Sequence, residues 1–581
     1  MCYSAKVAIN GYERKRKERW VLVDGRIINF DTDKGYGFIR PFDGSENLFF
    51  HVSQLKDTII KAEIGLIVEF DVKSGRRGKE AHNVKKRGKK KMVAPEPYEG
   101  ATHEYTDIEI NSFLKEIKKW KLEAKLEDLK RYFFDVPELK LIINGEQSYV
   151  IGRKGTGKTA LVEYMSEAPS DVSFVEKLSF KNFPFNVLYE QGNDKYTKPN
   201  QYITVWKFII YSFSCAMLAK DSDCPASTMK HINKVFPPTD SDSLSSLVKA
   251  WSIGDISLLV KGSGFSLQGF GRKKKKLSLM DKVDNLESFL LNNLTDNGFY
   301  LLFDELDEDY KDIQSSFLNS DYLDLLTSLF KAIQDIRAIF GKHQKQLYPV
   351  ILLRDDIYDL VKDADKNKWR DLTATIAWDE NEIRALLKHR LDKVFGVEGV
   401  DFDFTWFSIF SPFHVGFSGR TKYLPSFEYI TRSTQGRPRD YIQYLKSCAE
   451  LQLKNGGGKI TNSTIKEADK DYSNYLKNEL TDEIYGILPD IDAIFRVLGQ
   501  IRKWIFSRDE FREVHKDQYV SGILTTKDPD FILQTLFYFS VIGNVTRTNH
   551  HLYRQHNSSA TLNFKEKMVI HRGLMKALQI F

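Results

Sequence analysis

The sequence predicts a multidomain α/β protein, and three observations lead to this prediction. The chain has 581 residues, which is too long for a single hydrophobic core. Apolar strand-like segments alternate with helical segments between residues 106 and 377, a pattern typical of a parallel α/β sheet. Short strand-like segments separated by turns precede this region at 20–88, and a mostly helical region follows it from residue 378.

The N-terminal strand-like segments carry aromatic side chains on one side. Because side chains at i and i+2 of a strand share a face, Tyr36 and Phe38 are expected to point the same way, as are Phe49 and His51. Lys34 is expected on the side of Tyr36. Every nucleic-acid base offers a π-face, so such a surface suits single strands. Packing of the rings under another domain is the alternative.

The segment GRIINFDTDKGYGFIRPFDGSENLFFHVSQL resembles the cold-shock domain, with KGYGFI and LFFHVS at the spacing of the two RNA-binding motifs of that family. Over residues 20–88, the resemblance implies a five-stranded OB-type β-barrel that binds single-stranded RNA or DNA. It assigns the nucleic-acid contacts to Lys34, Tyr36, Phe38, Phe49 and His51. Asn29 stands where the family usually has Trp, so we expect weaker binding than in a domain with all its rings.

The positive charge of the chain is concentrated near the N-terminus. Residues 1–92 hold 21 Lys and Arg against 12 Asp and Glu, whereas the whole chain has a formal net charge of +7. This asymmetry favours a polyanionic partner, with a solvated basic surface as the alternative. The run KKRGKKK leads into a flexible basic linker at 89–105.

A glycine-rich segment, Gly152–Thr159, fits the pattern G-x-x-x-x-G-K-[ST] between an apolar strand and a helix. Backbone N–H groups of such a loop converge on phosphates, the lysine reaches the β- and γ-phosphates, and the hydroxyl at Thr159 ligates Mg²⁺. The predicted cofactors are ATP and Mg²⁺. The predicted nucleotide contacts are Gly152, Gly155, Thr156, Gly157, Lys158, Thr159 and Ala160.

An acidic segment follows a second apolar strand, Phe299–Phe303. Asp304 is predicted to hold Mg²⁺, and Glu305 to polarise the water that attacks the γ-phosphate. Asp307 could share that role, and the sequence does not separate it from Glu305. No NKxD motif is present, which favours ATP over GTP.

Two further segments resemble AAA+ ATPases and their STAND relatives. Arg354 follows the third apolar strand, where the resemblance implies a sensor of the nucleotide state. Arg437 and Arg439, in TQGRPRD, match a helical-lid signature that directs an arginine to the γ-phosphate. A surface arginine pair is the alternative. These segments predict a P-loop NTPase core at 106–377 and a helical lid at 378–478.

The final block, 479–581, resembles a winged helix, with a helix at 533–539 leading into a turn-rich stretch. It lacks a strong basic stripe, so we expect protein contact or intramolecular latching ahead of DNA contact. The run RKKKK at 272–276 is expected to be a solvated loop, with nucleic-acid contact second.

The remaining features bear on location and partners. The four cysteines form no CxxC pair, and no signal peptide or membrane span is readable, so we expect a cytoplasmic protein. The architecture resembles ATPases of phage defence, which implies a separate effector protein; homo-oligomerisation stays open. A nucleic-acid translocase and an adaptor that does not hydrolyse ATP are the alternative functions. A superfamily 2 helicase would need a second RecA-like domain, which is not recognisable after residue 400.

Overall fold

The computed structural model divides into two compact units, Met1–Glu96 and Pro97–Phe581. It describes residues 22–31, 35–41, 47–56, 66–75, 78–86, 105–167, 174–180, 200–236, 278–307, 318–412, 415–416 and 423–580. The first unit holds the N-terminal strands, and the second holds the α/β sheet and the helices that follow it.

The first unit is a closed barrel with the strand order β1-β2-β3-β5-β4. Neighbouring strands are antiparallel except β3 and β5, which pair in parallel. The strands are β1 (Leu22–Asp31), β2 (Tyr36–Pro41), β3 (Leu48–His51), β4 (Ile67–Gly75) and β5 (Gly78–Lys86). The five-stranded barrel expected from the sequence is therefore confirmed.

The barrel interior is filled by alternate side chains of its strands, among them Ile39 and Phe50. Gly37 lies against the ring of Phe50, and a Cβ atom there would come within 2.7 Å of that ring and 2.4 Å of the Asn29 carbonyl oxygen. Only glycine fits at this position. Val52 is 43% exposed, because β3 ends at His51 and a 3₁₀ turn begins at Val52.

The second unit contains a five-stranded parallel sheet with the order β10-β6-β9-β8-β7. Its strands are β6 (Tyr149–Gly152), β7 (Phe174–Ser179), β8 (Phe299–Asp304), β9 (Leu347–Arg354) and β10 (Thr373–Ile376). The parallel α/β core predicted from the alternating pattern is confirmed. Because β9 lies between β6 and β8, residues at the carboxyl ends of these three strands share one edge.

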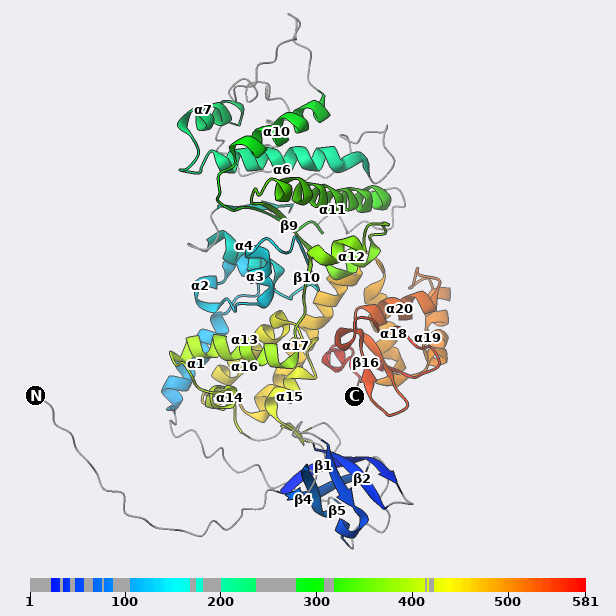
Figure 1. Ribbon diagram of the computed structural model, residues 1–581. Coiled ribbons are helices and arrows are strands. Elements are labelled where there is room, and N and C mark those ends of the chain that lie inside the picture. Colours follow the sequence, from blue (N-terminus) through cyan, green and yellow to red (C-terminus); the bar gives the residue numbers. More distant parts are fainter. Residues whose placement is uncertain are drawn as a thin grey trace, which may run out of the picture. The chain divides into compact units, whose positions relative to one another are not determined.

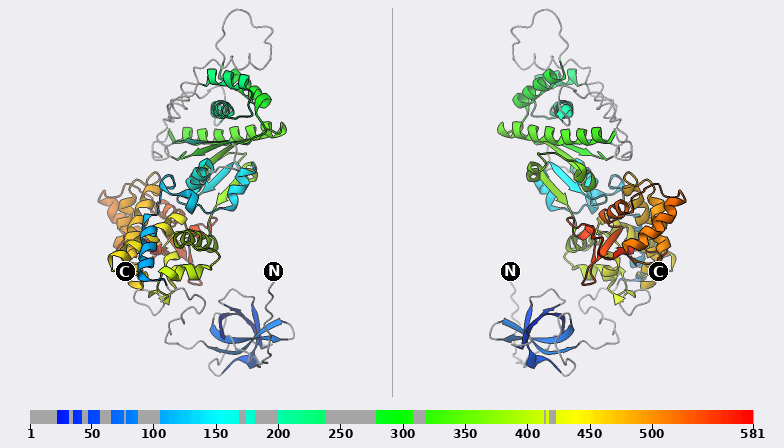
Figure 2. Two further views of the ribbon diagram at one scale, coloured as in Figure 1. Left: turned by 90° about the vertical axis from the view of Figure 1, so that its left-hand side faces the viewer. Right: turned by 90° about the vertical axis from the view of Figure 1, so that its right-hand side faces the viewer.

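Helices cover both faces of this sheet (Figures 1 and 2). Alternate strand residues enter two clusters: Leu301 and Ile351 pack toward one layer of helices, and Leu302 and Val350 toward the other. The first layer contains α6 (Ile203–Leu218), α7 (Ala226–Val235), α10 (Leu279–Asn293) and α11 (Leu318–Lys342). The second contains α3 (Pro137–Ile143) and α4 (Lys158–Glu167). Strands buried on both faces explain the continuous apolar runs in the sequence.

A helical region surrounds a separate apolar cluster. Helix α1 (Asp107–Lys119), which is preceded by the N-cap residue Thr106, packs against α16 (Pro438–Lys454) of this region. Leu114 and Leu445 are among the buried residues that the two helices contribute. The other elements are α13 (Glu380–Phe395), α14 (Phe402–Ile409), β11 (Val415–Gly416), β12 (Tyr423–Leu424), α15 (Ser426–Thr431), α16 (Pro438–Lys454) and α17 (Asn462–Ile484).

The C-terminal block continues the same cluster and carries a small antiparallel sheet of order β13-β16-β14-β15. Its elements are α18 (Ile491–Ile501), β13 (Ile505–Phe506), α19 (Arg508–Val520), α20 (Pro529–Tyr538), β14 (Ile542–Val545), β15 (His551–Leu552) and β16 (Met568–Ile570). Among the described residues, no helix combines the length and hydropathy needed to cross a bilayer.

Candidate functional site

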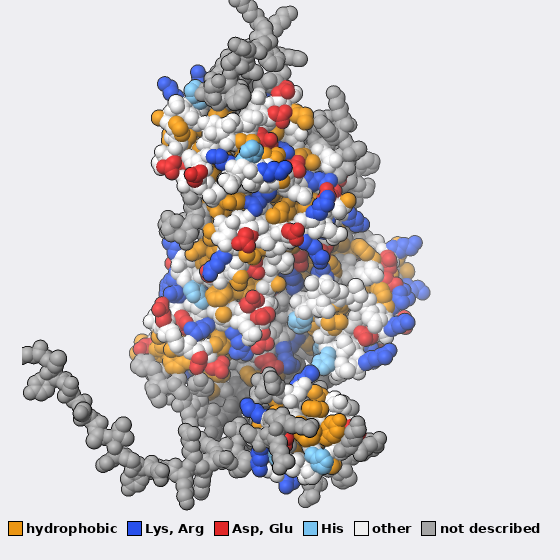
Figure 3. All heavy atoms as spheres, in the orientation of Figure 1, with side chains coloured by type: hydrophobic (Ala, Val, Ile, Leu, Met, Phe, Trp, Pro, Cys, Tyr) orange, Lys and Arg blue, Asp and Glu red, His pale blue; other side chains and the backbone are white. Residues whose placement is uncertain are grey.

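The aromatic surface of the barrel is built by β2 and β3. Their register pairs Tyr36 with His51 and Phe38 with Phe49. The Phe49 ring lies 5.7 Å from the ring of Tyr36 and 6.0 Å from that of Phe38, between centroids, and Phe38 is 36% exposed. Figure 3 shows hydrophobic side chains gathered on the displayed face of the barrel, with a histidine beside them. Lys34 lies outside the described residues.

Asn29 stands beside this surface. It is the register partner of Phe38 across β1 and β2, and its side chain is exposed. The next residue, Phe30, turns inward and stacks on Phe50 at 5.8 Å. The strand therefore presents an amide to solvent next to Phe38, where the family usually presents a ring.

The glycine-rich loop, Gly152–Thr159, connects β6 to α4. Gly155 and Gly157 have φ angles of 83° and 101°, a region that favours glycine. Lys158 folds back on the loop: its Nζ donates to the carbonyl oxygens of Gly152 at 2.6 Å and Arg153 at 3.0 Å. Burial lowers the pKa of this ammonium.

The first residues of α4 and the loop threonine complete this segment. The Thr156 hydroxyl donates to the Arg153 carbonyl oxygen at 2.8 Å, which closes the turn of the loop. Thr159 and Ala160 lie in the first turn of α4 and are half-buried. All predicted nucleotide contacts therefore fall on one loop and one helix N-terminus.

Asp304 ends β8 at the same edge of the sheet as the loop. Its side chain is buried, and its Oδ2 atom has no hydrogen-bond partner within the described part of the chain. Burial, and then the neighbouring carboxylate of Glu305, raise the pKa of Asp304 to about 6. A buried carboxylate oxygen without a partner is costly unless a cation completes the site.

Glu305 has a φ angle of 59° and turns its carboxylate toward β7. Oε1 accepts from Lys125 Nζ at 2.7 Å, and Oε2 accepts from the Ser179 hydroxyl at the end of β7. Burial acts to raise the pKa of Glu305, but the hydrogen bonds from Lys125 and Ser179 outweigh it and hold the pKa below the usual range. Both oxygens of the predicted water-activating group are engaged.

Arg354 lies at the end of β9, between the loop strand and the acidic strand. Its guanidinium forms a bidentate pair with Asp356, at 3.0 and 2.6 Å, and reaches Asp307 at 3.5 Å. Burial acts to lower the pKa of Arg354, and Asp356 outweighs it and raises the pKa. The predicted sensor arginine and Asp307 are thus in contact.

Arg437 and Arg439 flank the start of α16 and pack against the loop. A Cβ atom on Gly155 would lie 3.3 Å from Cβ of Arg439 and 3.7 Å from Cδ of Arg437. Arg437 is buried and paired with Asp440 at 3.0 Å and Glu483 at 2.7 Å. One of its Nη atoms also donates to the Lys154 carbonyl oxygen at 3.3 Å.

Arg439 is paired less closely. Its Nη1 atom lies 3.5 Å from Oε2 of Glu479. The same oxygen lies 3.3 Å from Nζ of Lys154 in the loop. The loop and the helical region therefore share one network of charged groups.

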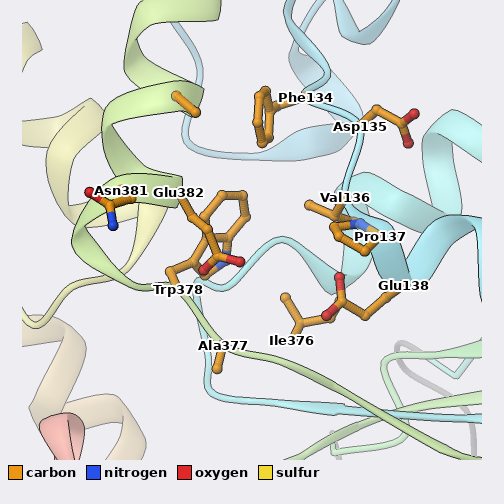
Figure 4. Close-up of a pocket in the computed structure, with 11 residues that line it drawn as sticks. Phe134, Asp135, Val136, Pro137, Glu138, Ile376, Ala377, Trp378, Asn381 and Glu382 are labelled. Carbon is orange, nitrogen blue, oxygen red and sulfur yellow. The ribbon is translucent and has the colours of Figure 1, made fainter. Parts of the chain in front are cut away.

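A cavity of about 380 Å³ opens beside the loop (Figure 4). Its walls are mostly apolar: Phe134, Val136 and Pro137 face Trp378 across it. The Trp378 indole N–H donates to the Thr156 carbonyl oxygen at 2.9 Å, which joins the cavity wall to the loop. A volume of this size suits a small organic ligand. The lining also includes carboxylates and an amide, from Asp135, Glu138, Glu382 and Asn381.

Sequence reasoning missed Lys125, Ser179 and the apolar cavity wall. The sequence signal available for the cavity wall was Trp378, an aromatic residue that immediately precedes Asp379, the capping residue of α13. Other predicted features lie outside the described residues: the basic run at 272–276 and the linker at 89–104. In the described ranges, no cluster of His, Cys, Asp and Glu has the composition of a metal site, and the described cysteines are buried and free.

Comparison with known proteins gave two family matches. The model of the 'cold-shock' DNA-binding domain matches residues 23–87, and that of the FunZ-associated C-terminal helical domain matches residues 381–481. Cold shock-like protein CspC of Shigella flexneri is 41% identical over 64 residues, which cover 11% of this chain and 91% of that protein. CspB of Bacillus cereus is 42% identical over 65 residues, covering 11% of this chain and 98% of that protein.

Two solved structures overlap with most of the chain at low similarity. The Aeropyrum pernix ORC2 protein in ADPNP–ADP complexes has a TM-score of 0.26 and 12% identity, covering 75% of this chain and 86% of that one. Drosophila ORC bound to DNA has a TM-score of 0.27 and 12% identity, covering 84% and 97%. Scores this low support no conclusion about fold or function.

Proposed function

Through residues 23–87 the chain belongs to the cold-shock domain family, and from this premise we propose that it binds single-stranded nucleic acid on its barrel and hydrolyses ATP in its α/β core. The two activities are coupled, so that nucleic acid on the barrel changes the nucleotide state of the core.

The barrel half of the proposal is supported by a group of aromatic rings in which Phe38 is exposed and Tyr36 and Phe49 are half-buried. The Phe49 ring on β3 lies next to the rings of both Tyr36 and Phe38 on β2. His51 is the register partner of Tyr36. Stacking contributes roughly 1–3 kcal/mol per base and tolerates any base. We assign the contacts to these four residues and to Lys34.

The nucleotide half is carried by one observation: the glycine-rich loop and Asp304, whose Oδ2 atom has no hydrogen-bond partner among the described residues, lie at one edge of the sheet, on β6 and β8. Lys158 and the loop amides would bind the phosphates, and the base would enter the apolar cavity against Trp378. The buried oxygen of Asp304 and the hydroxyl of Thr159 fit Mg²⁺, which prefers oxygen ligands. When bound, this ion neutralises charge on the phosphates.

We propose that Glu305 activates the attacking water, with Asp307 as the alternative. Arg354, Arg437 and Arg439 would report the nucleotide state. Each of these arginines is ion-paired with a nearby carboxylate, which belongs to Asp356, Asp440 and Glu479 respectively. Contact with a γ-phosphate therefore requires that some of these pairs exchange.

The block at 479–581 is proposed to be a winged helix, supported by the order of α18, β13, α19, α20 and a small antiparallel sheet. We propose that it latches onto the core rather than reads DNA. Its Tyr538 hydroxyl and Arg554 guanidinium both donate to Asp359, which lies shortly after Arg354 at the end of β9. We further propose a cytoplasmic role in phage defence, with a separate effector protein.

The test is steady-state ATP hydrolysis by the full chain, with and without single-stranded RNA or DNA oligonucleotides. The switch predicts basal hydrolysis that changes with the oligonucleotide. Lys158→Ala should abolish hydrolysis. The pair Tyr36→Ala and Phe38→Ala should keep basal hydrolysis and lose the response. Unchanged oligonucleotide binding by this double variant would overturn the barrel assignment.

Two alternatives give different results in the same assay. A translocase would also displace a labelled strand from a partial duplex in an ATP-dependent manner. An adaptor would bind ATP but show no turnover under any condition.

A further inference from the structure

The Glu305 side chain is directed away from the glycine-rich loop. In the sheet order β10-β6-β9-β8-β7, the loop follows β6, whereas Ser179 ends β7 on the opposite side of β8. Glu305 accepts from Ser179 through Oε2 and from Lys125 through Oε1, so one oxygen is held at the end of β7 and the other by Lys125. A carboxylate that polarises water must instead have an oxygen free to face the γ-phosphate.

Lys125 comes from outside the sheet. It lies in a short 3₁₀ turn, η2 (Ala124–Leu126), between α1 and α2 (Leu129–Tyr132). It is 180 residues from Glu305 in the sequence and lies near the phosphate-loop helix α4 through η2. The ammonium is thus brought to the acidic strand by a separate segment.

That segment is fastened to helix α13 of the helical region. The buried carboxylate of Glu127 pairs with Arg390, whose guanidinium also lies 4.5 Å from the Trp120 ring. Arg131 donates to the Lys393 carbonyl oxygen at 2.8 Å. Because Glu127 and Arg131 follow Lys125 closely in the chain and are bound to α13, a displacement of α13 would move Lys125.

We propose that Lys125 is a positioning residue that holds Glu305 away from the glycine-rich loop, so that hydrolysis requires the Lys125–Glu305 contact to open. The inference rests on the proposed ATPase activity. It adds a residue outside the strand-end motifs and ties the water-activating carboxylate to the segment bound to α13.

The exposure of the pair fits a contact that opens and closes. The Lys125 side chain is 35% exposed and that of Glu305 is 19% exposed. Water therefore screens the pair, and its disruption costs far less than that of a fully buried pair. The Arg390–Glu127 pair, exposed by only 6% and 7%, is by contrast a durable anchor.

The experiment compares ATP hydrolysis by the full chain carrying Lys125→Met, Lys125→Arg or Lys130→Met. Lys125→Met should raise basal kcat about fivefold, which corresponds to roughly 1 kcal/mol, with KM for ATP unchanged. Lys125→Arg keeps the positive charge and should stay near wild type. Lys130 is exposed on the neighbouring helix, so Lys130→Met is the matched control and should leave kcat unchanged.

The outcomes separate this inference from the proposed ATPase. A wild type that hydrolyses ATP, with an unchanged or lower kcat in Lys125→Met, would overturn the role of Lys125 alone. No hydrolysis by wild type or variant would overturn both. Turnover by Lys125→Met but not by wild type would support the inference. A purely structural role predicts a lower kcat and a lower melting temperature together.

A second measurement needs no nucleotide. Lys125 and Lys130 are modified with an amine-reactive reagent, and the labelling of each is measured by mass spectrometry. In the nucleotide-free wild type, Lys125 should react several-fold more slowly than in Glu305→Gln, while Lys130 reacts equally in both. Equal labelling of Lys125 in the two proteins would contradict the contact.

Discussion

Arg153, the second residue of the glycine-rich loop, donates a hydrogen bond of 2.7 Å from Nη2 to Oε1 of Gln435. Gln435 is buried, and its Nε2 donates to the carbonyl oxygens of Phe539 at 3.1 Å and Ser540 at 3.3 Å. One amide therefore links the loop, the helical region and the C-terminal block. The cavity between Arg153, Glu483 and Tyr538, about 10 Å³, has room for no more than about one water molecule.

Gln435→Ala should destabilise the second unit. Removing the amide leaves the Arg153 guanidinium and two buried carbonyl groups without this partner, which costs about 1–3 kcal/mol. Urea unfolding followed by tryptophan fluorescence measures the loss of unfolding free energy. Gln344→Ala, at an exposed position, is the control and should change the stability little. Equal stability of the two variants would contradict the bridging role of Gln435.

Asn29→Trp should strengthen binding of single strands. Asn29 is exposed and pairs in register with Phe38, so an indole there would extend the ring surface by one member. One added stacking contact is worth about 1–3 kcal/mol, or roughly a fivefold to hundredfold gain in affinity. Fluorescence anisotropy with a labelled oligothymidine at fixed salt measures this gain.

The control for that variant is Asn29→Ala, which removes the amide without adding a ring. It should bind close to wild type if the amide makes no base contact. A large loss of affinity in Asn29→Ala would show that Asn29 itself reads a base, and it would contradict our view of an incomplete surface.

The sequence predicted those features that depend on local spacing. The barrel motifs, the loop at Gly152–Thr159 and the acidic strand end each occupy one short segment, where the pattern of glycine, apolar and charged residues is informative by itself. The alternation of apolar strands and helices also predicted the parallel sheet. That Tyr36 and Phe38 share one face of their strand, and Phe49 and His51 one face of theirs, followed from the period of a strand.

Contacts between distant segments could not be predicted in this way. Ser179 is 126 residues from Glu305, and Lys125 is 180 residues from it, so no local pattern reveals that they hold one carboxylate. The strand order decides which strand ends become neighbours, and it depends on packing of the whole unit. For the same reason the pairing of Arg437 with Glu483, 46 residues further on, was not foreseen.

Asp359→Ala should loosen the C-terminal block. Asp359 Oδ2 accepts from the Tyr538 hydroxyl at 2.7 Å and from Arg554 at 2.9 Å, and the Arg554 guanidinium lies 3.7 Å from the Tyr538 ring. The carboxylate is the shared acceptor on α12 (Asp355–Leu360), the helix after the Arg354 strand. We expect the free energy of unfolding to fall by up to about 1 kcal/mol, because the Asp359–Arg554 ion pair is partly exposed.

Hydrogen–deuterium exchange measures that loosening. Amides of α20 and of residues 553–556 should exchange faster in Asp359→Ala than in wild type. Asp371→Ala, at an exposed position, is the matched control. Unchanged exchange in Asp359→Ala would argue against a latch at this contact.

Asp304→Asn should stabilise the nucleotide-free protein at neutral pH while abolishing hydrolysis. Burial raises the folded-state pKa of Asp304 to about 6, above the ordinary value of 3.8 for an aspartate. A raised folded-state pKa means that stability from this group is present below about pH 4 and is lost as the pH rises through 6. Above pH 6 wild type must bury a charged carboxylate, at a cost of about 1–3 kcal/mol. Removing that charge restores stability.

The pH dependence distinguishes this effect from general packing changes. Without Mg²⁺, the gain in unfolding free energy of Asp304→Asn over wild type should be largest at pH 7.5 and shrink toward zero near pH 4. Urea titrations at several pH values measure it. Added Mg²⁺ and ATP should stabilise wild type more than the variant, because a cation offsets the buried charge. A gain that is independent of pH would contradict the raised pKa of Asp304.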